Sequence, residues 1–291
     1  MLFRSLLLSE QLIAFRDTNG KVGIMDHRCP HRCASMFFGR NEEGGIRCVY
    51  HGWKFDVDGK CLEVPSLPAN SPFVDKVRIK SYPTYEKAGV IWAYMGPADR
   101  QPGYPDYEWM RAPKTHRHVT KYYQACNYLQ AMEGGLDTSH STFLHNNRMG
   151  NTNTMRNCDP CPQIDVYPTD YGYSYVSTRN INEESQYLRV YHYVMPVQQM
   201  RGDVTDDFGG RSKVPKSDGH FWVPIDDTQT MIWNWMYGVD EAAEITREFA
   251  ENDEKRAGRG KDDYIPGTFK LKRNPSNDYM IDRQQIGRAH V

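Results

Sequence analysis

The stretch CPH at positions 29–31, followed after sixteen residues by CVYHGW at positions 48–53, decides the fold. Each half offers one cysteine thiolate and one histidine imidazole on a short loop between β-like runs, and the proline stiffens the first loop by fixing its own φ. A cysteine and a histidine this close on a tight loop can reach the same centre. Cys29, His31, Cys48 and His51 are therefore the candidate ligands of one metal site.

The ligand types leave two interpretations of this site. Mixed Cys/His tetrads usually hold zinc, in patterns such as C-x2-C followed by H-x3-5-H. Here each loop carries one residue of each type, so two thiolates can take one iron and two imidazoles the other, as in a Rieske [2Fe–2S] cluster. Neutral imidazoles reduce the negative charge around the cluster, so it accepts an electron readily. The pattern favours this one-electron relay over zinc.

The residues around these loops predict a small antiparallel β domain. The short β-like runs are LIAF, KVGIM, RCVYHGWKFDV, VRIK and GVIWAYM, and turns separate them. The pair Asp58-Gly59 after KFDV is a hairpin signal. The segment PADRQPGYPDYEW is rich in proline and glycine, so it predicts a linker after this domain.

The second part of the chain predicts a mixture of helices and strands. It begins with an expected helix over 122–140, continues with the strands YGYSYVSTR, QYLRVYHYVM and TMIWNWMYG, and then has a polar helix near 240–255. We therefore expect an α+β fold with an antiparallel β domain over 6–98, a linker over 99–110, and a second domain over 111–285.

Composition excludes several classes of partner. Lys plus Arg at 36 against Asp plus Glu at 37 gives a net charge of −1, so no global field attracts nucleic acid or anionic lipid. No apolar run approaches the ~20 residues of a membrane helix, and the opening MLFRSLLLSEQ does not fit a secretory signal. Seven unevenly spaced cysteines argue against a disulfide framework, and Cys158 and Cys161 lack a second Cys/His pair. We expect a cytoplasmic protein with a small organic partner.

The segments CPHR, FFGRNEEGGIRCVYHGWKFDVDG and VIWAYMGP resemble the Rieske domain of bacterial aromatic-ring oxygenases, the phthalate-dioxygenase type in particular. The resemblance covers nearly the whole chain. It implies that residues 6–98 are an antiparallel β Rieske domain whose two Cys/His pairs hold a [2Fe–2S] cluster. It also implies that residues 111–285 are a catalytic domain with an antiparallel sheet wrapped by helices. One departure is Cys33, where members of this family usually carry a small residue such as glycine. An extra thiol beside a cluster is an oxidation liability.

A second candidate metal site lies in the segment NYLQAMEGGLDTSHSTFLH at 127–145. Asp137 and His140 are three apart and share a face of the expected helix, whereas His140 and His145 are five apart and align poorly on a regular helix. Either the helix ends between the histidines or it bulges, which the glycine pair at 134–135 makes easy. The spacing alone fits two surface histidines as well as a metal site.

The family resemblance favours the metal site. It implies that His140 and His145 bind a mononuclear Fe(II), and that a carboxylate from later in the chain completes a facial triad with open positions for O2. It also implies that Asp137 accepts a hydrogen bond from a cluster histidine of the neighbouring subunit, here His51, so that electrons cross between chains. A ring-like homo-oligomer follows, a trimer or a multiple of it.

The third iron ligand is expected beyond residue 291. In the family it comes from a helix after the segment that NDYMIDR resembles, so Asp278 and Asp282 both precede it. We therefore expect the triad of this chain to be incomplete and the fragment to be inactive.

Both ends of the chain carry an unusual pattern. MLFRS at 1–5 and IGRAHV at 286–291 can be written in codons that are largely reverse complements and match a common sequencing-library adapter. We expect that about Leu6–Gln285 is authentic, and the codons in the nucleotide record decide this.

The expected function is that of the terminal oxygenase component of a Rieske oxygenase system. The resemblance implies that a flavin- and iron–sulfur-containing reductase supplies electrons. It also implies that the iron uses O2 to dihydroxylate, hydroxylate or O-demethylate an aromatic compound, with an aromatic acid favoured. The alternative class is a Rieske-type electron carrier without its own catalysis, which needs the first domain alone. Roughly 180 further residues with Asp137, His140 and His145 argue against a carrier.

Overall fold

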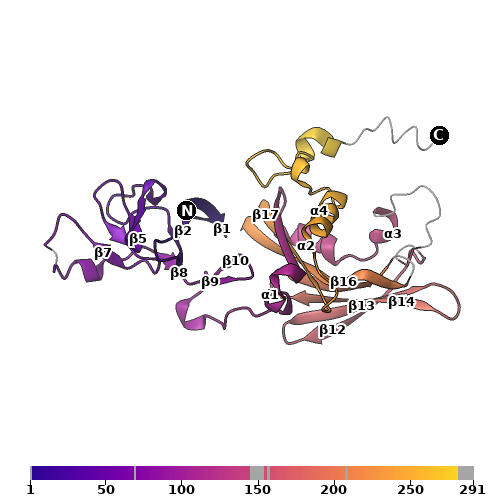
Figure 1. Ribbon diagram of the computed structural model, residues 1–291. Coiled ribbons are helices and arrows are strands. Elements are labelled where there is room, and N and C mark those ends of the chain that lie inside the picture. The colour runs from indigo at the N-terminus through magenta and orange to yellow at the C-terminus, as the bar shows by residue number, and fades with distance from the viewer. Residues whose placement is uncertain (1, 69, 145–153, 156–157, 207–208, 281–291) are drawn as a thin grey trace. The chain divides into compact units, whose positions relative to one another are not determined.

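The computed structural model describes residues 2–68, 70–144, 154–155, 158–206 and 209–280 (Figure 1). The chain divides into two compact units, Met1–Arg111 and Ala112–Val291. The finer limits expected from the sequence, including the linker, stay a prediction.

The first unit contains two four-stranded antiparallel sheets and a hairpin. The sheets have the strand orders β1-β2-β3-β8 and β4-β5-β6-β7, and β9 pairs with β10. The strands are β1 Leu2–Leu7, β2 Glu10–Arg16, β3 Val22–Asp26, β4 Arg40–Glu42, β5 Gly45–Arg47, β6 Lys54–Phe55, β7 Cys61–Glu63, β8 Ser81–Tyr82, β9 Thr84–Lys87 and β10 Val90–Ala93. The helices are the 3-10 turns Met36–Phe38, Val74–Lys76 and Ala98–Arg100, and the short α1 Glu108–Arg111.

The core of the first unit joins its two sheets. Ile13 and Met25 from one sheet and Ile46 and Phe55 from the other are completely buried in one apolar cluster. Full burial of such a side chain is worth roughly 1.5–3 kcal/mol. The two candidate ligand cysteines belong to the same cluster. The two loops that carry the candidate ligands therefore start from the buried core of the unit.

The second unit is a seven-stranded antiparallel sheet with the order β11-β17-β16-β15-β14-β13-β12 (Figure 1). Its strands are β11 Arg117–Gln124, β12 Gln163–Thr169, β13 Gly172–Asn180, β14 Gln186–Val194, β15 Gln198–Thr205, β16 Arg211–Asp226 and β17 Gln229–Gly238. Its helices are the 3-10 turn Lys114–His116, α2 Tyr128–Leu136, α3 Ser141–Leu144, α4 Arg247–Arg256 and the 3-10 turns Lys261–Asp263 and Pro275–Met280.

Helices α2 and α4 pack on one face of this sheet. Met132 of α2 contacts Trp222 and Ile232, which face each other on β16 and β17. Met236, an even number of positions further along β17, packs with Ala250 of α4 on the same face. The sheet wrapped by helices confirms the expected fold class.

The helix expected over 122–140 is wrong in its first part. Residues Arg117–Gln124 form β11 and pair along their whole length with β17. This run is rich in aromatic and β-branched residues, and cross-strand pairing outweighs a weak helical pattern. Helix α2 begins at Tyr128, where the side chain of Asn127 accepts a hydrogen bond from the Leu129 N–H at 2.9 Å. The polar helix expected from residue 240 begins at Arg247, after the N-cap Thr246.

The glycine pair of α2 lies in regular helix instead of a bulge. A Cβ on Gly135 would lie 2.3 Å from a ring carbon of Trp222, whereas a Cβ on Gly134 would meet nothing within 4 Å. Gly135 therefore lets α2 approach β16 closely, just before the helix ends at the candidate iron-binding segment.

Substitution of these two glycines should have opposite effects. Gly135→Ala should lower the free energy of unfolding by about 1–3 kcal/mol, because the methyl group overpacks against Trp222. Gly134→Ala, the matched control, should raise it by up to about 1 kcal/mol through helix propensity. Urea denaturation of the purified variants measures both. Equal effects of the two substitutions would contradict the close approach at Gly135.

Candidate metal centres

The two loops of the first unit have the same backbone turn. The carbonyl of Cys29 accepts a hydrogen bond from the N–H of Cys33 at 2.9 Å, and the carbonyl of Cys48 accepts one from the N–H of Gly52 at 3.0 Å. The closing residue is left-handed in both loops, with φ of +57° at Cys33 and +75° at Gly52. The loops are thus two copies of one turn, each beginning with a cysteine.

The two cysteines bring their thiols together in the core. Cys29 is 2% exposed and Cys48 is 4% exposed, and the two thiols are close enough for Cys48 to affect the ionisation of Cys29. Burial raises the pKa of the Cys29 thiol to about 11, and the adjacent Cys48 contributes to the same shift. Two thiolates are therefore unfavourable here unless a metal cation compensates their charge.

The two histidines face each other beside the thiols. The ring centroids of His31 and His51 are 4.5 Å apart, and the His31 ring stacks on Trp53 at 4.5 Å with an interplanar angle of 5°. Among the described residues, the buried Nδ1 of His31 has no hydrogen-bond partner. Burial, followed by the charges of His51 and Arg32, lowers the pKa of His31. A neutral imidazole with an unused nitrogen is a ready metal ligand.

These four residues fit the [2Fe–2S] cluster of a Rieske centre. The structure brings two buried thiols to one place and two imidazoles beside them, and each side of a binuclear cluster needs two protein ligands. No three His, Cys, Asp or Glu side chains converge on a single metal ion within the described ranges.

The second loop is held by an arginine that precedes its cysteine. The Nη1 of Arg47 donates to the carbonyl of Gly52 at 2.8 Å, and its Nη2 donates to Glu63 at 2.8 Å. Glu42 also accepts a hydrogen bond from the same guanidinium. Arg47 therefore ties the last residue of the turn to β7 and fixes the position of His51. No sequence motif indicates this role of Arg47.

The left-handed conformation of Cys33 explains why glycine suits this position. We expect Cys33→Gly to raise the free energy of unfolding by up to about 1 kcal/mol, because a Cβ disfavours positive φ. Cys33→Ala is the matched control: it removes the thiol, keeps the Cβ and should leave stability unchanged. Urea denaturation of the two cluster-loaded variants separates the backbone effect from the effect of the thiol. Equal free energies of unfolding for Cys33→Gly and Cys33→Ala would contradict backbone strain at Cys33.

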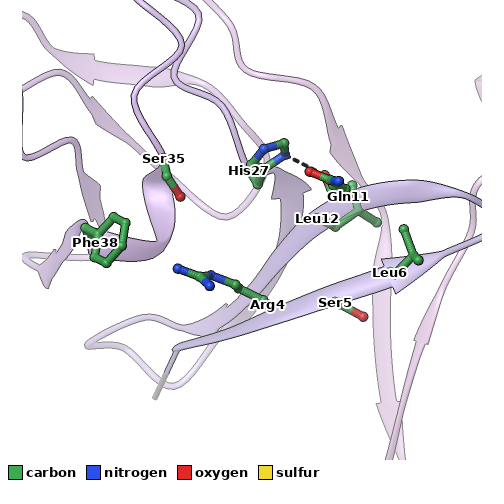
Figure 2. Close-up of a pocket in the computed structure, with 8 residues that line it drawn as sticks. All are labelled: Arg4, Ser5, Leu6, Gln11, Leu12, His27, Ser35 and Phe38. Atoms are coloured by element: carbon green, nitrogen blue, oxygen red, sulfur yellow. Dashed lines mark hydrogen bonds between the residues drawn. The ribbon is translucent and has the colours of Figure 1, made fainter.

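A cavity of about 550 Å³ in the first unit is distinct from these four ligands. Figure 2 shows it between β1, β2 and the segment before the first 3-10 helix. The imidazole Nδ1 of His27 lies 3.1 Å from the carbonyl of Gln11 in its wall. Its lining residues are Arg4, Ser5, Leu6, Gln11, Leu12, His27, Ser35 and Phe38.

The second candidate centre begins where α2 ends. The N–H of Asp137 donates to the carbonyl of Glu133 at 3.0 Å as the last bond of the helix. The carboxylate of Asp137 accepts hydrogen bonds from the N–H of Ser139 at 2.7 Å and of His140 at 3.3 Å. The Nδ1 of His140 lies 3.4 Å from the same carboxylate. A compact turn therefore presents Asp137 and His140 together.

The structure corrects how these residues come together. Asp137 and His140 do not share a helix face, because α2 ends at Leu136 and the chain turns on the Asp137 carboxylate. His145 lies outside the described residues, as does Asp282. Asp278 is described and forms part of a 3-10 turn with positive φ. The assignment of the mononuclear iron ligands therefore stays a prediction.

The helix-covered face of the sheet carries polar groups that the sequence analysis missed. The Nδ1 of His220 on β16 lies 2.7 Å from the Oδ1 of Asn234 on β17, and desolvation lowers the pKa of His220 to about 4. Arg201 of β15 pairs with Asp218 at 3.0 Å. For Asn234 the available signal was a polar residue inside the otherwise apolar run of β17.

Comparison with known proteins identifies both units. Residues 3–83 match the Rieske [2Fe-2S] domain, and residues 93–290 match the domain described as LigXa C-terminal domain like. The chain belongs to the Rieske non-haem iron oxygenases. It is 35% identical to the 3-chlorobenzoate-3,4-dioxygenase oxygenase subunit of Comamonas testosteroni, over 98% of this chain and 68% of that protein. It is also 35% identical to the phthalate 4,5-dioxygenase oxygenase subunit of Pseudomonas putida, over 97% of this chain and 65% of that protein.

Solved structures share the fold of this Rieske oxygenase. Dicamba monooxygenase bound to dicamba superposes with a TM-score of 0.66 at 17% identity, over 89% of this chain and 76% of that one. NdmA of Pseudomonas putida CBB5 superposes with a TM-score of 0.68 at 21% identity, over 88% and 72% of the two chains. These likenesses confirm the two-domain fold.

The family membership confirms the expected class and cofactors. Rieske oxygenases combine a [2Fe–2S] cluster with a mononuclear iron that uses O2, and oxygenase-subunit relatives match both units of this chain. A pure electron carrier would need the first unit alone, so that alternative has no support. The chain spans about two thirds of the length of the two relatives. No helix in the described part of the chain is both long and apolar enough to cross a bilayer.

Proposed function

We propose that the complete protein is the terminal oxygenase component of a Rieske system that oxidises an aromatic compound. The observation that carries this proposal is the presence of two separate sets of candidate ligands in one chain. One is the buried thiol pair beside two imidazoles, and the other is the turn at the end of α2 with Asp137 and His140. A flavin- and iron–sulfur-containing reductase is the proposed electron donor, and the cytoplasm is the proposed compartment.

Each candidate residue takes a specific role in this proposal. Cys29 and Cys48 hold one iron of the cluster, after each thiol has lost its proton. His31 and His51 hold the other as neutral imidazoles. When bound, the cluster supplies single electrons and the mononuclear iron supplies O2 activation. The Trp53 ring, stacked on His31, keeps that imidazole in one orientation.

The second centre is proposed to need residues from outside the described ranges. His140 and His145 are the proposed histidine ligands, and the carboxylate that completes the set lies beyond residue 291. Asp137 is proposed to accept a hydrogen bond from His51 of a neighbouring copy, which requires a homotrimer or a multiple of it. The turn supports this role, because the Asp137 carboxylate lies next to His140 and remains half exposed.

An aromatic acid is the proposed substrate class. Relatives of this chain are named for 3-chlorobenzoate, phthalate, phenoxybenzoate and toluene-4-sulfonate, all of which are aromatic anions. Another relative is a 5,5'-dehydrodivanillate O-demethylase oxygenase subunit, so the class of reaction extends from ring hydroxylation to O-demethylation. The choice among these reactions depends on the shape of the substrate pocket.

Iron content and one substitution test the two-centre proposal. The complete protein should hold about three irons per chain, whereas a Rieske carrier would hold about two. His140→Ala should remove the mononuclear iron and abolish substrate oxidation, while the optical and paramagnetic spectra of the cluster stay unchanged. His192→Ala, a histidine of β14 outside this segment, is the control and should retain both. Zinc in place of iron and labile sulfide would overturn the proposal.

A second substitution tests the electron bridge. Asp137→Asn should keep the mononuclear iron but slow its reduction by the cluster, because the amide cannot accept a charge-assisted hydrogen bond from the partner's imidazole. Single-turnover experiments with pre-reduced protein measure this rate. Reduction of the iron at the wild-type rate would remove Asp137 from the path.

A further inference from the structure

The segment between α2 and α3 rests on hydrogen bonds from the sheet below it. The hydroxyl of Tyr175 on β13 donates to the carbonyl of Leu136 at 2.6 Å. Arg179 lies further along β13 on the same face of the strand, and its Nη2 donates to the carbonyl of Thr138 at 2.7 Å. Two sheet side chains thus hold the carbonyls on either side of Asp137.

Arg179 is fixed in one position by its surroundings. It is 1% exposed, and its Nη1 donates to the Ser177 hydroxyl at 2.8 Å. Both terminal nitrogens also lie 3.3 Å from the hydroxyl of Thr138, and Nη2 lies 3.4 Å from that of Ser141. These bonds go to neutral oxygens, so the buried guanidinium is stabilised by several dipoles of the segment that it supports.

The geometry uses the planar shape of the guanidinium. One nitrogen is anchored to the sheet through Ser177, and the other reaches the backbone of the segment at Thr138. A lysine ammonium is a single point donor and cannot reproduce this fork. The cation also lies beyond the carbonyl end of α2, where a positive charge is favourable.

The bonds act on the two candidate iron-binding residues through the backbone. Thr138 lies between Asp137 and His140, and its carbonyl also accepts from the Ser141 hydroxyl at 2.8 Å. Hydrogen bonds from the sheet hold the carbonyls of Leu136 and Thr138. The Asp137 carboxylate between them accepts from the N–H groups of Ser139 and His140, so the backbone of this turn is held from both sides.

We propose that Arg179 is a positioning residue that holds the segment 136–141 in the conformation that binds the mononuclear iron. The proposal rests on the proposed function of His140 as an iron ligand. It assigns to a buried arginine of β13 a role in presenting the ligand, through hydrogen bonds to the backbone and hydroxyl groups of the segment.

The experiment uses the complete protein with Arg179→Gln and Arg179→Lys, and Arg211→Gln as the control. Arg211 is an exposed arginine of the same sheet that pairs with Asp240. Mononuclear iron affinity is measured by competition with a ferrous chelator, and Arg179→Gln should weaken it about 10- to 100-fold, as loss of a supporting residue does at other metal sites. Arg179→Lys should weaken it less, and Arg211→Gln should leave it unchanged. The cluster spectrum should be the same in all variants.

Hydrogen exchange in the iron-free protein gives a readout that does not depend on the metal. The amides of Ser139 and His140 should exchange faster in Arg179→Lys than in wild type, while the midpoint of thermal unfolding stays within a few degrees. If Arg179→Gln does not fold, the same measurements are made on Arg179→Lys and Ser177→Ala. Ser177→Ala removes the hydroxyl that anchors the guanidinium and keeps Arg179, and it should also speed exchange of the Ser139 and His140 amides.

The outcomes separate this inference from the proposed function. Wild-type iron affinity and wild-type exchange in the folded Arg179 variants would overturn the positioning role. Absence of mononuclear iron from the wild-type complete protein would instead overturn the proposed iron site. In that case exchange of the 136–141 amides still shows whether Arg179 fixes the segment.

Discussion

The structure of the first unit depends on two buried thiols in contact. Cys29 and Cys48 lie at the edge of an apolar core, and burial raises the pKa of Cys29 so far that ionisation is unfavourable without a cation. The two turns that begin at these cysteines then place His31 and His51 side by side. Bound iron would supply the positive charge that this arrangement needs, so folding of the loops and assembly of the cluster would stabilise each other.

The second unit has a different structural requirement. Its expected mononuclear iron needs coordination positions that no protein ligand occupies, so that O2 can bind. Its ligands are expected on an irregular segment, and irregular backbone carries N–H and carbonyl groups that need partners. The Asp137 carboxylate satisfies two N–H groups, and side chains of β13 satisfy two carbonyls. Four backbone groups of this non-helical segment are therefore hydrogen-bonded to side chains.

The sequence predicted the parts of the molecule that depend on local spacing. The Cys/His pairs, the strands of the second unit and the two-part α+β organisation follow from short motifs and from alternation of apolar residues. The first part of the expected helix over 122–140 was wrong because the partner of Arg117–Gln124 is β17, more than a hundred residues later. Arg47 and Arg179 were missed for the same reason, since each acts on a loop through contacts that no spacing reveals.

The position of β12 at one end of the seven-stranded sheet has a consequence for solubility. Ile164, Val166 and Tyr167 are about half exposed on this strand. A terminal strand with apolar side chains and unpaired backbone groups can accept a strand from another molecule and begin aggregation. Pro168 follows them directly and has no N–H to offer, so it shortens the stretch to which a foreign strand could add. Pro168 therefore limits strand addition, and with it aggregation, at this edge of the sheet.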